Sequence, residues 1–156
     1  MTSTPATAEP GDPVAALFAA ACRAHAHAYA PYSQFHVGAA IRSSSGVVYA
    51  GCNVENAAYP QGWCAEASAI AAMVTAGERR ISEVLVVTDG DDLGTCCGGC
   101  RQKLREFAPL DTLVHVAGLE GVRRVFTLGE LLPASFGPEN LEHNHPGPPT
   151  APEGTR

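Results

Sequence analysis

The fold is decided by residues 63–70, whose sequence is WCAEASAI. Within this stretch the thiol of Cys64 comes two residues before the carboxylate of Glu66, and the small apolar residues around them predict a helix over residues 64–76. The free N–H groups and the positive dipole at a helix N-terminus favour the thiolate form of cysteine, which is the form that binds metal ions. The stretch therefore predicts a thiolate and a carboxylate side by side at the start of a helix.

A second cysteine motif, C-x-x-C, is formed by Cys97 and Cys100 and opens a predicted helix over residues 97–107. Its two sulfurs fall on one face of that helix, so both can bind one metal ion. With Cys64 they make a three-thiolate set for a tetrahedral zinc ion, and the fourth position stays open for water, as in catalytic zinc sites. Cys96 is an alternative ligand that would close the site and make it structural; we prefer Cys97, because it gives the two-residue spacing.

The charge of this site needs an explanation, because three thiolates and one Zn²⁺ sum to about −1. The two helix dipoles offset part of it. Arg101 directly follows Cys100, and we interpret it as a charge-compensating residue that donates to a sulfur. Glu66 is the candidate catalytic residue, since a carboxylate beside the metal can take a proton from water and pass it to a substrate.

The composition fits one ordinary globular domain, with 156 residues of which 46% are hydrophobic and 17% charged. The net charge of −6 disfavours binding to a phosphate backbone. We see neither an apolar run long enough for a membrane span nor a secretory signal in the first 12 residues. We therefore expect no nucleic-acid or membrane partner, a cytoplasmic location, and six reduced cysteines that serve a metal or catalysis rather than disulfides.

Hydrophobic periodicity predicts a helix, two strands, a helix, a strand, a helix, two strands and a short last helix. This order indicates an α/β three-layer sandwich, in which a mixed five-stranded sheet is flanked by helices. We expect one domain over residues 13–141 between disordered tails at 1–12 and 142–156. The expected elements span residues 13–29, 35–41, 47–52, 64–76, 81–87, 97–107, 113–117, 122–126 and 127–132.

Arg23 and His25 are expected on the more solvent-exposed side of the first helix. Asp89, Asp91 and Asp92 are interpreted as a turn-rich acidic loop with no calcium-binding role.

Several blocks of the sequence, in order from about residue 14 to 141, resemble the small, homotetrameric, zinc-dependent cytidine deaminases. Zinc deaminases of this kind combine a first zinc ligand, then x-E, with a later C-x-x-C, and the Glu is not a ligand. The matching blocks are YAPYSQFHVGAA at 29–40, GCNVENAAY at 51–59, CAE at 64–66, CGGCRQ at 97–102 and LLPASFGP at 131–138.

The resemblance implies hydrolytic deamination of cytidine and 2′-deoxycytidine to the uridines with release of ammonia, a step of pyrimidine salvage. It implies one zinc ion per subunit on Cys64, Cys97 and Cys100, with Glu66 moving protons to N3 of the ring and to the departing amine. It also implies a homotetramer whose subunits share active sites. The substrate would be a free nucleoside.

The resemblance also carries over substrate contacts, position by position. Asn53 and Glu55 match the pair that holds the ribose 3′-hydroxyl, and the main chain of Ala65 matches a contact to the base. The loop with Tyr59, and Phe136, match parts that reach into a neighbouring subunit's site. The matching substrate-binding residues are Phe35, Asn53, Glu55, Tyr59, Ala65 and Phe136.

The chain departs from the family pattern at three positions. Ala67 follows the candidate catalytic Glu where three-cysteine members often have Arg, so Arg101 and the helix dipoles have more charge to offset. Cys96 stands where a Pro usually precedes the second motif, and the bulky Trp63 precedes the first metal ligand.

Two other functions remain open at this stage. A deaminase of another aminated heterocycle, such as blasticidin S, would use the same metal chemistry, although Asn53 and Glu55 favour a ribose. A zinc-binding module without activity would have a closed four-ligand site and no role for Glu66. Without the resemblance, Asn53 and Glu55 could equally be turn residues, and Phe35 and Phe136 would be read as core packing.

Overall fold

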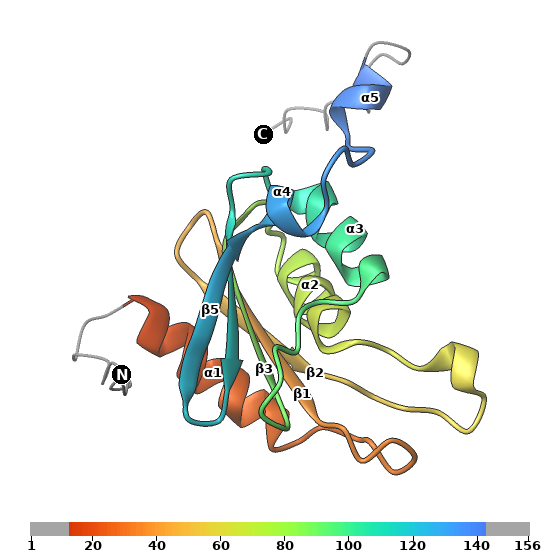
Figure 1. Cartoon of the computed structure of the whole chain (residues 1–156). Helices are drawn as coiled ribbons and strands as arrows, with labels where there is room; N and C mark the ends of the chain where they lie inside the picture. Colours follow the sequence, from red (N-terminus) through yellow and green to blue (C-terminus); the bar gives the residue numbers. More distant parts are fainter. Residues whose placement is uncertain (1–12, 143–156) are drawn as a thin grey trace, which may run out of the picture.

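The computed structural model describes residues 13–142, so the expected tail at 1–12 and, apart from residue 142, the expected tail at 142–156 lie outside the described residues. Five strands form one sheet in the order β2-β1-β3-β4-β5 (Figure 1). Strands β3 and β4 are parallel, and the other neighbours are antiparallel, which confirms the predicted mixed sheet. The strands are β1 (Val37–Ser43), β2 (Val48–Cys52), β3 (Ile81–Thr88), β4 (Leu113–Gly118) and β5 (Gly121–Thr127).

Helices cover both faces of the sheet (Figure 1), which confirms the three-layer architecture. Helix α1 (Pro13–His25) packs on one face, and helices α2 (Ala65–Thr75) and α3 (Gly98–Phe107) lie on the other. Side chains of β3 alternate between the two layers: Leu85 and Val87 join the core under α1, and Val84 and Val86 join the core under α2 and α3. This double burial explains why β3 reads as a continuous apolar run.

The remaining elements are short. They are the 3₁₀ turn η1 (Tyr59–Gln61), α4 (Leu128–Leu131) and α5 (Glu139–Glu142). The sequence pattern did not predict α5, which runs one residue past the expected domain boundary at 141. None of the helices in residues 13–142 is long and apolar enough to cross a membrane.

A glycine sets the position of α2 on the sheet. A Cβ atom on Gly51 of β2 would overlap Ser68 and the main chain of Ala69, so this helix can approach the strand only where the side chain is missing. The close approach fixes α2, and with it the two residues Cys64 and Glu66 at its N-terminal end.

The sequence pattern predicted that the first helix runs to Tyr29, but helix α1 ends at His25. The chain leaves the helix because the main chain of Tyr29 bonds the segment that follows β2. Tyr29 N–H donates to the carbonyl of Asn53 at 3.0 Å, and the Glu55 N–H donates to the carbonyl of Tyr29 at 2.8 Å. This pairing carries Asn53 and Glu55 toward the loop after α1.

The expectation that His25 faces solvent is wrong. His25 is 8% exposed and continues the buried row of Leu17 and Ala21, which are spaced four residues apart on α1. Its ring bonds Asp89, the residue directly after β3, so this residue of the acidic loop has a partner on α1.

Candidate active site

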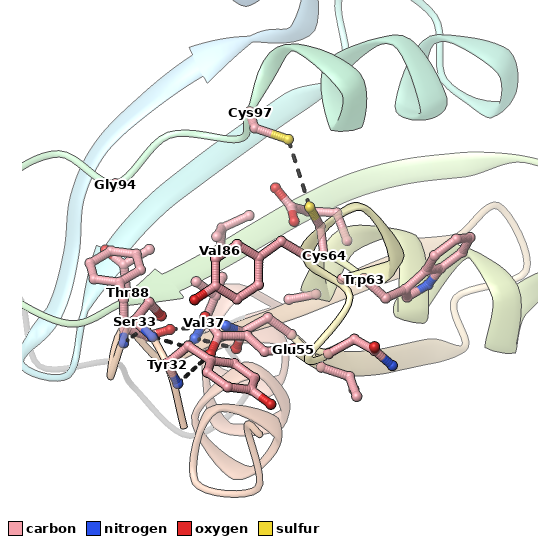
Figure 2. Close-up of a pocket in the computed structure, with 18 of the residues that line it drawn as sticks. Tyr32, Ser33, Val37, Glu55, Trp63, Cys64, Val86, Thr88, Gly94 and Cys97 are labelled. Carbon is pink, nitrogen blue, oxygen red and sulfur yellow. Dashed lines mark hydrogen bonds between the residues drawn. The ribbon is translucent and has the colours of Figure 1, made fainter. Parts of the chain in front are cut away.

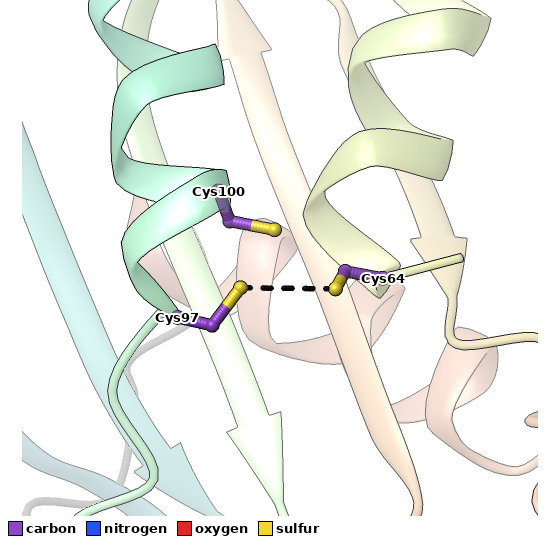
Figure 3. A group of neighbouring side chains, drawn as sticks. All are labelled: Cys64, Cys97 and Cys100. Carbon is purple, nitrogen blue, oxygen red and sulfur yellow. Dashed lines mark hydrogen bonds between the residues drawn. The ribbon is translucent and has the colours of Figure 1, made fainter. Parts of the chain in front are cut away.

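Three cysteine sulfurs meet between the N-terminal ends of α2 and α3 (Figure 3). Cys64 is the N-cap residue of α2, Cys97 is the N-cap residue of α3, and Cys100 lies in the first turn of α3. The Cys64 and Cys97 sulfurs are 3.8 Å apart, and all three sulfurs lie within 4.8 Å of one another. Two thiolates bound to a tetrahedral zinc at 2.3 Å are separated by about 3.8 Å, so the donor set fits this ion.

The thiols of Cys64 and Cys100 differ in acidity. Hydrogen bonding with Cys100, and then with Cys97, lowers the pKa of Cys64 to about 6 against the opposing effect of burial, and the charge of Lys103 adds to the lowering. The pKa of Cys100 is raised, because its thiol donates to Cys64 and is buried. Cys64 is therefore largely a thiolate at neutral pH, which is the form of cysteine that binds a metal ion.

Cys96 lies outside this group of sulfurs. It is 1% exposed, and burial, followed by the negative charge of Glu66, raises its pKa well above the ordinary value. Cys96 therefore stays a protonated thiol beside the carboxylate, whereas Cys97 faces Cys64. Cys97, which the two-residue spacing favoured as the ligand, is thus the one of these two adjacent cysteines that joins the group of sulfurs.

Arg101 does not donate to a sulfur in the described part of the chain. Its Nε donates to the carbonyl of Cys96 and its Nη1 to the carbonyl of Leu131, both at 2.7 Å, and its Nη2 donates to Thr95 Oγ1 at 3.0 Å. The guanidinium thus ties the segment before α3 to the end of α4. The donation to sulfur inferred from sequence adjacency is corrected, because each of the three guanidinium nitrogens donates to an oxygen atom.

Glu66 is 4% exposed and lies in the first turn of α2, where its side chain lines a cavity of about 600 Å³. Cavities of this size commonly hold small molecules. Figure 2 shows Cys64 and Cys97 facing each other at one end of the cavity, with Tyr32 and Ser33 toward the other. The site therefore combines a metal-type donor set, a buried carboxylate and room for a substrate.

Five of the six predicted substrate-binding residues line this cavity, namely Phe35, Asn53, Glu55, Tyr59 and Ala65. Phe136 does not line it; this residue is 60% exposed, and its carbonyl accepts a hydrogen bond from Gln102.

Glu55 and Asn53 have partners that hold them in place. Glu55 Oε2 accepts from the N–H groups of Tyr32 at 2.9 Å and Ser33 at 3.2 Å. The Ser33 hydroxyl is the main cause that lowers the pKa of Glu55, with these N–H groups and His36 contributing, so the carboxylate is ionised at neutral pH. Asn53 Oδ1 accepts from the Val37 N–H, and its Nδ2 donates to the Phe35 carbonyl, both at 2.9 Å.

Sequence reasoning missed several lining residues, including Tyr32, Ser33, Thr88 and Thr95. A signal for Thr88 existed, because it ends a buried strand, and ligands of α/β proteins bind at the carboxyl ends of strands.

Comparison with known proteins places these features in a family. The family model for the cytidine and deoxycytidylate deaminase zinc-binding region matches residues 13–116. A cytidine deaminase of Sporosarcina psychrophila is 39% identical over 81% of this chain and 93% of its own. One of Mycobacterium tuberculosis is 38% identical over 78% of this chain and 87% of its own.

Solved structures agree with this match. The crystal structure of cytidine deaminase from Burkholderia pseudomallei has a TM-score of 0.74 and 40% identity, and the match covers 78% of this chain and 98% of that one. The cytidine deaminase structure from Mycobacterium tuberculosis has a TM-score of 0.70 and 36% identity, covering 80% of this chain and 97% of that one.

Proposed function

Since the chain belongs to the family of the cytidine and deoxycytidylate deaminase zinc-binding region, we propose that it catalyses the hydrolytic deamination of cytidine and 2′-deoxycytidine. The products are uridine or 2′-deoxyuridine and ammonia. The observation that carries the proposal is the meeting of three cysteine sulfurs with a buried carboxylate at one end of the cavity.

Cys64, Cys97 and Cys100 would hold one zinc ion, whose role when bound is to acidify a water at its open fourth position. Glu66 takes a proton from the attacking water and gives it to N3 of the cytosine ring as the C4–O bond forms; it then takes the proton of the new C4 hydroxyl and gives it to the amino group, which leaves as ammonia when the C4–N bond breaks. The low exposure of Glu66 keeps bulk water from competing for these protons.

The other lining residues position the nucleoside. The ionised Glu55 accepts from the ribose 3′-hydroxyl, and Asn53, which has donor and acceptor capacity left on its amide, completes the contact. Phe35 packs beside the nucleoside, and the main chain of Ala65 contacts the base.

The charges of the cavity favour a nucleoside over a nucleotide. Among the described residues that line it, no Lys, Arg or His side chain is present, whereas Glu55 and Glu66 are. A 5′-phosphate would find no cationic partner here and would meet a carboxylate at the sugar end.

We also propose that the catalytic domain spans residues 13–141 and that it assembles as a homotetramer with shared active sites. Tyr59 is 75% and Phe136 60% exposed in the single chain, and burial against a neighbouring subunit would remove these apolar rings from water. Arg101 would compensate thiolate charge through space, in addition to its bonds to oxygen. A cytoplasmic location suits thiol ligands that must stay reduced.

The experiment that tests the proposed function is a steady-state ultraviolet assay of the zinc-loaded protein with five compounds side by side. They are cytidine, 2′-deoxycytidine, CMP, cytosine and blasticidin S. We expect rapid turnover of the two nucleosides and weak or no turnover of the others, because only the nucleosides present a free sugar to Asn53 and Glu55 and add no phosphate.

Each other result has a distinct meaning. Faster turnover of CMP would make the protein a nucleotide deaminase, and selective turnover of blasticidin S would establish the alternative substrate class. No turnover of any compound at full zinc content would contradict the catalytic site and favour a structural zinc.

A further inference from the structure

The wall of the cavity at residues 35–37 is held from two sides. On one side, Asn53 bonds the carbonyl of Phe35 and the N–H of Val37. On the other side, Asp89 Oδ2 accepts from the His36 N–H at 2.7 Å and from His36 Nδ1 at 2.8 Å. Phe35 and Val37 line the cavity, and the His36 ring between them bonds Asp89, which is not one of the lining residues.

Asp89 is itself anchored to helix α1. Its Oδ1 accepts from Nε2 of the buried His25 at 2.9 Å, and the two imidazole rings lie 5.8 Å apart. Burial acts to raise the pKa of Asp89, but the hydrogen bonds from His36 and His25 hold this pKa below its usual range. An ionised carboxylate can only accept, so His25 carries a proton on Nε2 and His36 carries one on Nδ1.

The backbone just before this wall would not adopt its conformation unaided. Gln34 has φ of +55°, in the left-handed region that residues other than glycine rarely occupy. Such a residue persists only where the surrounding contacts determine it. The bonds of Asp89 and Asn53 to residues 35–37, which directly follow Gln34, supply contacts of this kind.

From this geometry we infer that Asp89 is a positioning residue for the nucleoside. Through His36 it holds Phe35 and Val37 against Asn53 at the sugar end of the cavity, and through His25 it ties this wall to α1. Asp89 touches no substrate, so its loss weakens nucleoside binding more than the chemical step. The inference rests on the proposed function, because it concerns the binding of the same substrate.

The test compares Asp89→Asn with Asp91→Asn, the same change at a nearby exposed carboxylate outside the cavity. Three quantities are measured: kcat and KM for cytidine, and Kd for uridine from the fluorescence of Trp63, the chain's one tryptophan, which lines the cavity. For Asp89→Asn we expect KM and Kd to rise about ten-fold while kcat changes less than about three-fold. Asp91→Asn should match the wild type.

A second pair of variants separates positioning from general damage to the fold. His36→Asn keeps an N–H donor near the place of Nδ1, whereas His36→Ala removes it. At equal zinc content and similar thermal midpoints, His36→Asn should keep a KM near the wild-type value, and His36→Ala should raise KM as Asp89→Asn does.

The outcomes are distinguishable. If the wild type deaminates cytidine but Asp89→Asn behaves like Asp91→Asn, or if kcat falls with KM unchanged, the positioning role is overturned and the proposed function stands. If His36→Asn and His36→Ala are equally impaired, the hydrogen bond to Asp89 is not the cause. If the wild type neither binds uridine nor deaminates cytidine, both the proposed function and this inference are overturned.

Discussion

Replacing Glu66 with glutamine is expected to lower kcat for cytidine by about 10³- to 10⁴-fold, at the upper end of what general acid–base catalysis contributes. Glutamine has almost the same shape as glutamate but cannot take a proton from water or deliver one to N3 and to the amine. Because Glu66 is buried and lies at the cavity beside the sulfurs, bulk water has poor access to replace it as a proton carrier.

The measurement is the loss of cytidine absorbance under saturating substrate, with zinc content determined on the same sample. Glu66→Gln should keep about one zinc per chain, because the carboxylate is not one of the three clustered donors. Glu106→Gln on the exposed face of α3 is the matched control and should leave kcat unchanged. Near-normal activity of Glu66→Gln would mean that Glu66 is not the proton carrier.

The second large effect is expected on zinc affinity, at Cys97 and not at its neighbour Cys96. Cys97→Ala should lower zinc affinity by more than about 100-fold, beyond the effect of losing an outer-shell partner, and should abolish turnover. Cys96→Ala, the same change one residue earlier, should keep close to one zinc per chain, since Cys96 lies beside Glu66 and outside the group of sulfurs.

Competition with a chromophoric chelator measures the zinc affinities of both variants, and thermal unfolding in the presence of a chelator shows whether each apoprotein still folds. Zinc loss in Cys96→Ala together with zinc retention in Cys97→Ala would reverse the ligand assignment. Equal zinc loss in both would indicate a four-cysteine site.

The sequence predicts the layers and the family because their signals are local. The run at β3 is apolar on both faces, the helices after Cys64 and Cys97 begin at these residues, and the solved relatives share the fold. The two cysteine motifs group the three sulfurs, and the fold brings them together because α2 follows β2 and α3 follows β3, two strands that run parallel on either side of β1 and end at the same edge of the sheet.

What the sequence does not predict is contact between distant polar residues. His25 and Asp89 are 64 positions apart, and neither residue carries a motif, so both look like surface residues until α1 packs on the sheet. For Arg101, a residue close in sequence suggested the wrong hydrogen-bond partner. Its adjacency to Cys100 suggests a sulfur partner, but the side chain turns to carbonyl oxygens of Cys96 and Leu131 that only the folded chain supplies.

The central claim is that the three cysteines hold an open, catalytic zinc, and zinc K-edge X-ray absorption on the zinc-loaded protein tests it most directly. The account predicts three sulfur neighbours at about 2.3 Å and one lighter oxygen neighbour at about 2.0 Å. A shell of four sulfurs would show that Cys96 has joined the ligands, that the site is closed, and that the proposed deaminase activity cannot arise from this zinc.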